Sequence, residues 1–232
     1  MLSIRALLIV SITGFLAIIA ATWLIMLAYA DLNAGSTQAK LDQWHKNRST
    51  LDVTEWETTH DALHEALRIR PNNPEYLELM ARLYLWKAYQ SGEDTSAARH
   101  ARQQALQYFQ QALKVSPSRP QLWAGVVESK QALGQYDESM QQAIRVAAEY
   151  GPWLPGVQRV IMRAGTESWQ YLAPETRESV LQILEYALGV QPEEVIKLAI
   201  QRNFGRSLLP LIYKDEALME FYKKELAKKK RS

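Results

Sequence analysis

An uncharged stretch near the N-terminus constrains this chain more than any other feature of its sequence. Residues 6–30 carry no charged side chain and lie between Arg5 and Asp31. As a helix with a rise of 1.5 Å per residue, the stretch would be about 37 Å long, which is enough to cross a bilayer with some tilt. A buried core helix would be expected to show a polar stripe, whereas this run has few polar interruptions. The sequence therefore predicts an N-terminal membrane anchor over residues 1–31.

The same segment could instead be a cleaved secretory signal. Ala28, Tyr29 and Ala30 form a small–x–small site before Asp31, and Arg5 supplies a positive n-region. The apolar stretch is longer than the usual signal core, which favours an uncleaved anchor. The short tail before the span resembles a signal-anchor, although basic residues also follow the span. We therefore predict a single-pass protein of the bacterial inner membrane, with the bulk of the chain in the periplasm.

The overall composition excludes several classes of function. The 232 residues include 27 basic and 25 acidic side chains, so no global field indicates nucleic acid as a partner. The absence of cysteine excludes disulfides and thiolate chemistry, and removes the commonest zinc ligands. Glycine and proline fall between periodic segments, which indicates an all-helical fold. The chain is long enough for one ordinary domain beside the anchor.

A helical pattern with small residues on one face is clearest at residues 104–117. Ala105 and Ala112 flank Phe109 on this face, so a neighbouring helix can approach closely there. Pro117 ends the helix because it has no N–H to continue the hydrogen-bond ladder. This small–large–small–Pro pattern resembles the second helix of a tetratricopeptide (TPR) repeat.

Neighbouring segments fit the same repeat. Pro71 and Pro117 are 46 residues apart, about a dozen more than the 34 of a standard repeat, and the extra residues are expected to extend both helices between them. Pro117 and Pro152 are 35 residues apart, and Trp123 takes the aromatic position of the repeat. The expected helices lie at residues 55–70, 74–90, 104–117, 152–165 and 174–189, with a standard pair between Pro120 and Gly151.

Two regions flank these repeats, which are assigned to residues 55–192. Residues 32–54 are polar and are expected to form a linker, with a flexible connector at residues 33–37, that runs into a short helix. Residues 193–232 are expected to form C-terminal capping helices, because a solenoid would otherwise expose its terminal apolar face. The basic tail at residues 228–231 is expected to be a solvated helix end rather than a site for lipid or nucleic acid. The predicted fold is therefore all-α: one N-terminal transmembrane helix, a TPR-like helical solenoid and a C-terminal capping helix.

The TPR resemblance implies a partner-binding groove. In that family, stacked helix pairs form a right-handed superhelix whose concave face, lined by first helices, binds extended peptides or partner helices. Chaperone-binding members have Lys and Asn where this chain has Glu78 and Arg82, so capture of a terminal carboxylate is not expected. A mixed-charge, amphipathic partner segment is expected instead. The groove residues implied are Glu75, Glu78, Arg82, Leu85 and Trp86 in one repeat, and Gln121, Ala124, Glu128 and Gln131 in the next.

Signals for catalysis or metal binding are weak. His60 and His64 are one helical turn apart, but Asp61 stands where a zinc-protease helix needs Glu, and no third ligand is suitably spaced. No nucleophile–base set, phosphate-binding loop or recognisable carboxylate pair stands out. We therefore expect no enzyme activity, no cofactor and no metal. Core packing is expected for Trp123, whereas Trp86 could either pack in the core or stack against sugars.

The layout as a whole is similar to the VpsP-type proteins of bacterial exopolysaccharide biosynthesis, which have one N-terminal membrane segment and a helical repeat region. The similarity rests on that layout and on residues 56–90. It implies a non-catalytic scaffold that supports polysaccharide synthesis or export through protein partners of the cell envelope. Two alternatives remain open: a translocon-, chaperone- or cytochrome-maturation-associated protein that binds clients, and a soluble glycan-binding or glycan-trimming protein released by cleavage after Ala30.

Overall fold

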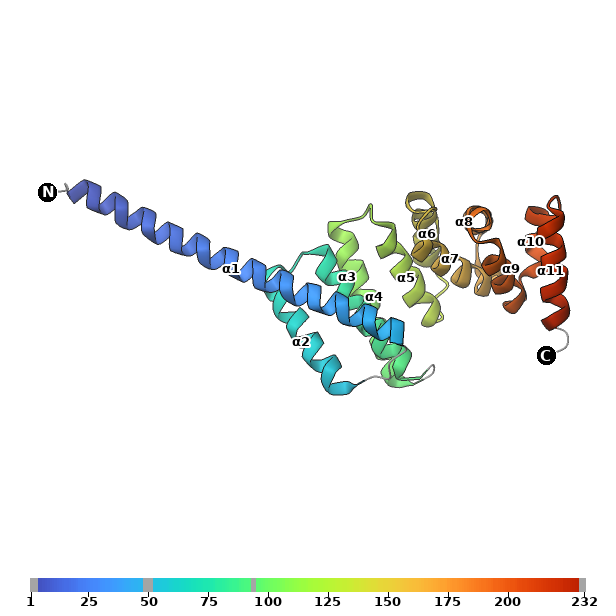
Figure 1. Cartoon of the computed structure of the whole chain (residues 1–232), viewed down its shortest axis with the longest axis horizontal. Helices are drawn as coiled ribbons and strands as arrows, with labels where there is room; N and C mark the ends of the chain where they lie inside the picture. The colour runs from blue at the N-terminus through green and yellow to red at the C-terminus, as the bar shows by residue number, and fades with distance from the viewer. Residues whose placement is uncertain (1–3, 48–51, 93–94, 230–232) are drawn as a thin grey trace.

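The described part of the chain is entirely helical. The computed structural model describes residues 4–47, 52–92 and 95–229, with side chains from residue 11 onward. Within these ranges it contains eleven α-helices, one short 3-10 helix and no β-strand, which confirms the all-α prediction. One long helix projects from an array of shorter helices, and the two ends of the chain lie at opposite ends of the molecule (Figure 1).

The long helix, α1 (Ile4–Asn47), begins as a candidate membrane span. It is the one helix in the described chain that is long and apolar enough to cross a membrane. Large apolar side chains such as Phe15, Leu24 and Ile25 are exposed around this half of the helix, and no other element covers them. A surface of this kind is stable in an apolar medium rather than in water.

The expected flexible connector at residues 33–37 is wrong, because these residues lie inside α1. The hydroxyls of Ser36 and Thr37 donate to the carbonyl of Asn33, at 2.8 and 3.0 Å, so they bond within the helix. Packing then outweighs the weak helix propensity of Asn, Gly, Ser and Thr. The buried side chains on this half of α1 are Ala30, Ala34, Thr37, Leu41 and Trp44. Residues 48–51 of the expected linker lie outside the described chain.

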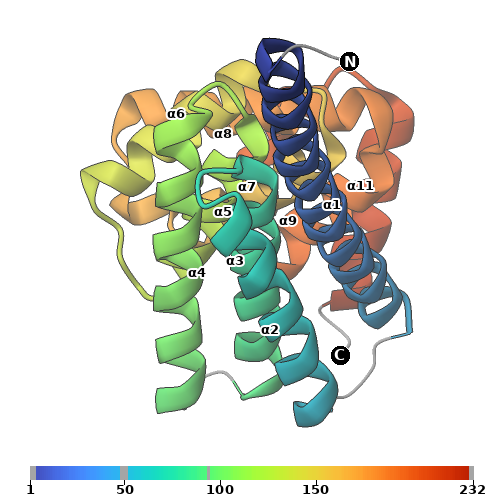
Figure 2. The same cartoon turned by 90° about the vertical axis from the view of Figure 1, so that its left-hand side faces the viewer.

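The second helix, α2 (Val53–Ile69), folds back along the packed half of α1. The indole of Trp44 donates to the Glu55 carboxylate at 3.1 Å near one end of this hairpin. Arg70 lies 3.2 Å from the Asp31 carboxylate at the other end, beside the start of the apolar span. Seen from the N-terminal side, α4 lies on the opposite side of α2 and α3 from α1 (Figure 2).

Three consecutive helix pairs follow, and each pair packs on the next. They are α3 (Pro74–Gln90) with α4 (Ser96–Val115), α5 (Pro120–Ala132) with α6 (Glu138–Tyr150), and α7 (Pro155–Glu167) with α8 (Pro174–Val190). Proline begins four of these helices, where the first-turn N–H groups have no partner within the helix. The 17 and 20 residues of α3 and α4 exceed the 13 residues of α5 and of α6, which confirms that the long proline spacing extends both helices.

The contact between α4 and α5 is built as the small–large–small pattern predicts. Ala105 and Ala112 are fully buried, and Phe109 between them is 2% exposed. The Phe109 ring lies so close to α5 that a Cβ on Gly125 would sit 2.4 Å from a ring carbon. Glycine at position 125 therefore lets the two helices approach. Trp123 packs against the same core, and its indole donates to the Pro117 carbonyl at 2.7 Å.

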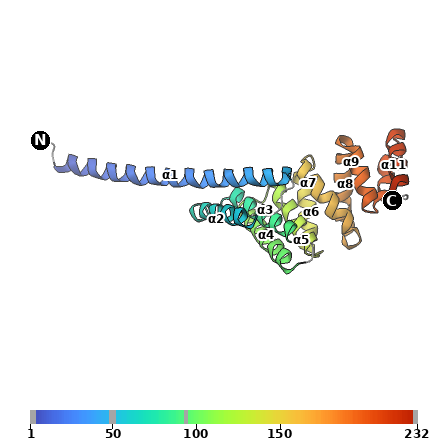
Figure 3. The ribbon, with the colours of Figure 1, turned by 60° about the horizontal axis from the view of Figure 1, so that its bottom comes forward.

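The C-terminal region contains three helices, α9 (Pro192–Gln201), α10 (Gly205–Ile212) and α11 (Glu216–Lys229). The later helices lie beyond the C-terminal end of α1 (Figure 3). Lys229 on α11 donates to the carbonyls of Ile200 and Gln201, at 2.6 and 3.2 Å, and so places a cation at the negative end of α9. Residues 230–232, which include part of the expected basic tail, lie outside the described chain.

Two helices in the C-terminal half of the chain differ from the sequence-based expectation. Helix α7 begins at Pro155 rather than Pro152, because residues 151–154 form a turn in which the Leu154 N–H bonds to the Gly151 carbonyl at 3.1 Å. Helix α10 was not expected, since Pro210 lies within it. Its residues Leu208 and Ile212 are fully buried, and this burial supports a short helix that local propensity disfavours.

Candidate functional site

Two adjoining pockets lie between α3, α5 and α7, with volumes of about 540 and 410 Å³. We call them together the trough. The helices α3 and α5 touch each other little, whereas α5 and α7 pack along their length, so the trough opens between the second and third helix pairs. The longer α3 extends past α5 and forms one wall. The trough is lined by His45, Arg82, Leu85, Trp86, Ala88, Tyr89, Arg102, Glu128, Gln131, Ala132, Arg163, Glu167 and Arg202.

The predicted groove residues on α3 do not line an open groove along their whole length, because α1 packs against them. The Arg82 guanidinium donates to the Gln38 side chain at 2.7 Å and lies 3.4 Å from the Asp42 carboxylate. Trp86 is 6% exposed, and its ring stacks on the ring of Trp44 with centroids 6.1 Å apart. The structure therefore places Trp86 in the core and leaves no open ring face for sugar stacking.

The other predicted residues of α3 lie nearer the span. Glu78 pairs with Arg119 at 2.8 Å. Glu75 is exposed and, together with Glu78, lines a separate pocket of about 440 Å³ whose other side is formed by Asp31 and its neighbours on α1. Leu85 is the predicted residue of α3 that lines both pockets of the trough. The chain's own α1 thus occupies the part of the predicted groove nearest the candidate span.

The predicted residues of α5 divide into two groups. Glu128 and Gln131 line the trough, as the resemblance implies. Ala124 is buried in the core, and Gln121 is exposed but lines neither pocket. The TPR resemblance therefore implied two residues that line the trough, and it could not show where the trough ends.

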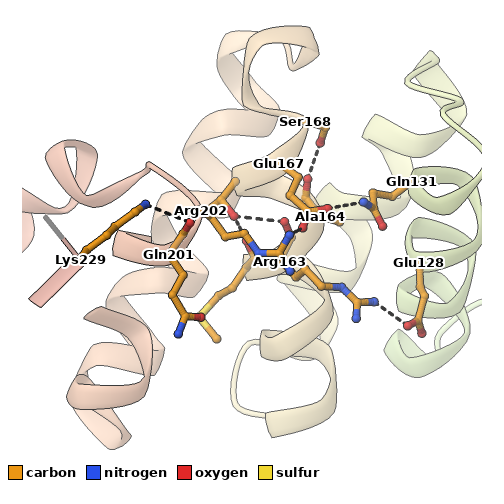
Figure 4. Close-up of polar contacts among 11 residues, drawn as sticks. Glu128, Gln131, Arg163, Ala164, Glu167, Ser168, Gln201, Arg202 and Lys229 are labelled. Atoms are coloured by element: carbon orange, nitrogen blue, oxygen red, sulfur yellow. Dashed lines mark hydrogen bonds and ion pairs between the residues drawn. The ribbon is translucent and has the colours of Figure 1, made fainter. Parts of the chain in front are cut away.

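A series of polar contacts crosses the trough from α5 through α7 to the end of α9 (Figure 4). Arg163 on α7 contacts Glu128 at 2.6 Å. Glu167, one turn further along α7, accepts from the Gln131 side-chain amide and pairs with Arg202. Arg163 and Glu167 of α7 thus connect neighbouring helices. A larger pocket of about 830 Å³ continues this face between α7 and α9, and Arg163 lines it too.

Sequence reasoning missed Arg163, Glu167 and Arg202 as site residues. The sequence did contain a signal, because Arg163 and Glu167 are four residues apart and so share one face of α7. The side chains of Arg163 and Glu128 are each about a third exposed, and ion pairs of this kind contribute at most about 1 kcal/mol to stability. The Nε of Arg163 is buried and has no hydrogen-bond partner in the described chain. These ion pairs therefore contribute little to the stability of the fold.

The two histidines of α2, His60 and His64, pack against aromatic neighbours. His60 stacks on Trp56, with ring centroids 5.0 Å apart, and its Nε2 lies 3.2 Å from the Tyr84 hydroxyl. His64 stacks on the His60 ring, with ring centroids 6.1 Å apart. Within the described residues, no group of three or more His, Asp or Glu side chains is arranged to hold a metal ion. Packing between α2 and α3 accounts for these contacts.

The pKa of the Glu78 carboxyl group is shifted by its surroundings. Its side chain is 17% exposed, and burial raises the pKa of Glu78 above its ordinary value although Arg119 and Arg82 act in the opposite direction. Because the pKa is higher in the folded state than in the unfolded state, the folded protein holds this proton more tightly. The stabilisation that Glu78 contributes is therefore fully present below the unfolded value of 4.5 and is lost as the pH rises through the folded value.

We expect Glu78→Gln to remove this part of the pH dependence. The wild-type protein should lose stability relative to the variant as the pH rises above about 4.5. Urea unfolding of the full-length protein in detergent micelles at a series of pH values measures the difference. The exposed Glu175 on α8, which does not act on Glu78, provides a control through Glu175→Gln. A wild-type advantage that grows with rising pH would contradict the raised pKa.

Comparisons with known proteins assign no family to the chain. No protein-family model matches it, and no curated protein sequence matches it. The functional argument therefore rests on the residues and contacts described above.

Proposed function

We propose that this protein is a non-catalytic, membrane-anchored scaffold whose helical region is a TPR-like solenoid. The order of the helix pairs supports this proposal, because α3, α5 and α7 alternate with α4, α6 and α8 and each pair packs on the next. The close contact of Phe109 with Gly125 also supports it, since the repeat pattern requires small residues where helices approach. On this interpretation, the packed half of α1 and α2 form the first pair.

The unbroken course of α1 carries the proposal. One helix is a candidate span at its N-terminal end and packs against α2 and α3 at its other end. A scaffold needs its binding surface at a defined place, and a continuous helix provides this better than a flexible linker. Arg70 and Tyr76 both contact Asp31, where the apolar stretch ends, and so tie the α2–α3 turn to that point.

We further propose that the helical domain lies in the periplasm and serves a polysaccharide synthesis or export complex. The signal-anchor character of the N-terminus supports the location, and the layout shared with VpsP-type proteins supports the process. Alkaline phosphatase fused to the C-terminus is expected to be active. An inactive fusion would place the domain in the cytoplasm instead.

Release of the domain by cleavage after Ala30 is disfavoured by packing. Ala30 is fully buried within the fold, so a cut there would expose the first packed turn of α1. It would also leave Asp31, which pairs with Arg70, at a frayed helix end. The mass of the protein extracted from membranes is therefore expected to equal that of the uncleaved chain.

Photocrosslinking from the trough in living cells tests the scaffold function. A photoreactive residue in place of Tyr89, which is exposed at the trough, is expected to capture one envelope protein. The same residue at Tyr171, which is exposed but does not line the trough, is the matched control. A heterogeneous set of captured proteins would favour the client-binding alternative. Deletion of the protein should lower polysaccharide output, and unchanged output would remove the polysaccharide assignment.

A further inference from the structure

The helical domain begins where the apolar stretch of α1 ends, with no spacer between them. Leu27, Ala30 and Ala34 follow one another at three- and four-residue spacing, so they share the face of α1 that packs on the domain. Leu27 is half-buried and Ala30 is fully buried, although both belong to the uncharged stretch 6–30. The domain therefore covers one face of the last turn of the candidate span.

The α2–α3 turn is the part of the domain that lies beside this last turn of the span. Arg70, which caps the end of α2, lies 3.2 Å from the carboxylate of Asp31, the first charged residue after the stretch. The Tyr76 hydroxyl in the first turns of α3 donates to the same carboxylate. Figures 1 and 3 both show the end of α2 beside the middle of α1. The turn and the end of the stretch are therefore at one level along α1.

The length of the stretch decides how deep this turn lies when α1 spans a bilayer. Residues 6–26, which precede Leu27, form about 31 Å of helix at 1.5 Å per residue. The hydrocarbon core of a bilayer is by itself about 30 Å thick, and the headgroup layers bring the total to about 40–45 Å. Residues 27–31 are therefore needed to cross one headgroup layer. The turn that packs beside them lies in that layer.

The side chains at this level suit a layer of lipid phosphates. Tyr29 is 53% exposed, and an exposed tyrosine is typical of the membrane–water interface. Residues 66–74 contain two arginines and no acidic side chain. The carboxylate of Asp31 is paired with Arg70, and Glu75 lies at the positive end of α3, so neither carboxylate faces the phosphates uncompensated.

We infer that the α2–α3 turn, residues 70–73, lies within the headgroup layer of the membrane that α1 crosses, and that Arg70 donates to lipid phosphate there. This inference rests on the proposed membrane-anchored scaffold and adds the lipid surface as a partner of the helical domain. The Arg70 side chain is 42% exposed, and a guanidinium has several N–H donors, so it can bind Asp31 and a phosphate together. Contact at the turn and the continuous α1 then hold the domain directly against the membrane surface.

Fluorescence quenching in nanodiscs tests the depth of the turn. The chain has no cysteine, so a single cysteine at the exposed Asn72 can carry a fluorophore. The nanodiscs contain phosphatidylcholine, part of which carries a quenching nitroxide on its headgroup. A fluorophore at residue 72 should lose most of its emission. The matched control is Ser139, which is exposed in the first turn of α6, a helix further from the span (Figure 1). Equal quenching at the two positions would overturn the inference.

Solid-state NMR in the same lipid tests the phosphate contact. With an isotope label at the guanidinium carbon of every arginine, dephasing by lipid phosphorus reports the arginines that contact phosphate. Arg70→Lys should reduce the dephased signal, because it removes one guanidinium from the phosphate layer but keeps a cation beside Asp31. Arg99→Lys, at an exposed position of α4, should leave that signal unchanged. Circular dichroism checks that both variants fold. An equal dephased signal from the wild type and Arg70→Lys would overturn the phosphate contact.

A fluorophore at Leu16 separates failure of this inference from failure of the anchor. Leu16 lies in the apolar stretch and is exposed, so its fluorophore should be quenched by lipids that carry the nitroxide on the acyl chain. If Leu16 is quenched and residue 72 is not quenched by the headgroup nitroxide, the anchor stands and the inferred contact of the turn is wrong. If Leu16 is not quenched either, α1 does not span the bilayer and the proposed anchored scaffold is wrong.

Discussion

Replacing Phe109 with alanine is expected to lower the free energy of unfolding of the helical region by about 3–5 kcal/mol. Phe109 is buried between Ala105 and Ala112, and its ring fills the space above Gly125 on α5. Truncation leaves a cavity that the helices cannot easily close, because α5 is also held by α6 and α7. Urea unfolding in detergent micelles, followed by circular dichroism, measures the loss.

The neighbouring residue supplies the control for this experiment. Gln110 follows Phe109 on α4 and is exposed, so Gln110→Ala should change stability by no more than about 0.5 kcal/mol. If Phe109→Ala and Gln110→Ala had the same small effect, the ring would not be a core residue. The interpretation of residues 104–117 as the packed second helix of a repeat would then be wrong.

Helix boundaries set by local chemistry were predictable from the sequence. The expected helix at residues 74–90 has the bounds of α3, because Pro74 favours a helix start and the Asn73 side chain accepts from the backbone N–H groups of Glu75 and Tyr76. The turn between α5 and α6 is equally local, since Gly134 adopts a positive φ of 69° that glycine tolerates without strain.

The expectations that failed were decided by contacts between distant parts of the chain. Residues 33–37 have the composition of a loop, but Ala34 and Thr37 are buried against other helices, and this burial keeps α1 helical. Helix α10 has the same explanation, because Tyr222 of α11 closes over its first residue, Gly205. No pattern within either segment identifies these partners.

The candidate site shows the same division between local and distant information. The TPR resemblance implied Glu128 and Gln131, which share one face of α5 because they are three residues apart. It could not show that α1 covers Trp86, since Trp44 lies more than forty residues earlier in the sequence. It also could not pair Glu167 with Arg202, which reaches the trough from the end of α9. The trough is therefore a product of how the helices pack.

A proline in α1 should have the second large effect, by separating the span from the domain. Tyr29→Pro removes a backbone N–H of α1 just before Ala30, the first packed residue, and clashes with the preceding turn, at a cost of about 3 kcal/mol or more. The Tyr29 side chain is itself exposed, so its loss removes no packing. We expect α1 to break at this point, so that the domain tumbles on its anchor.

Distances between spin labels in the span and in the domain measure this break. The chain has no cysteine, so single cysteines introduced at Leu16 and Gln121, both exposed, can be labelled selectively. Tyr29→Pro should broaden the distance distribution, whereas Tyr29→Ala loses the same side chain but keeps α1 helical and should leave it narrow. Crosslinking from Tyr89 to its envelope partner should fall with Tyr29→Pro alone, because the trough is intact but no longer held at a fixed place above the membrane. Equal distributions for the two variants would mean that contacts other than the continuous α1 orient the domain.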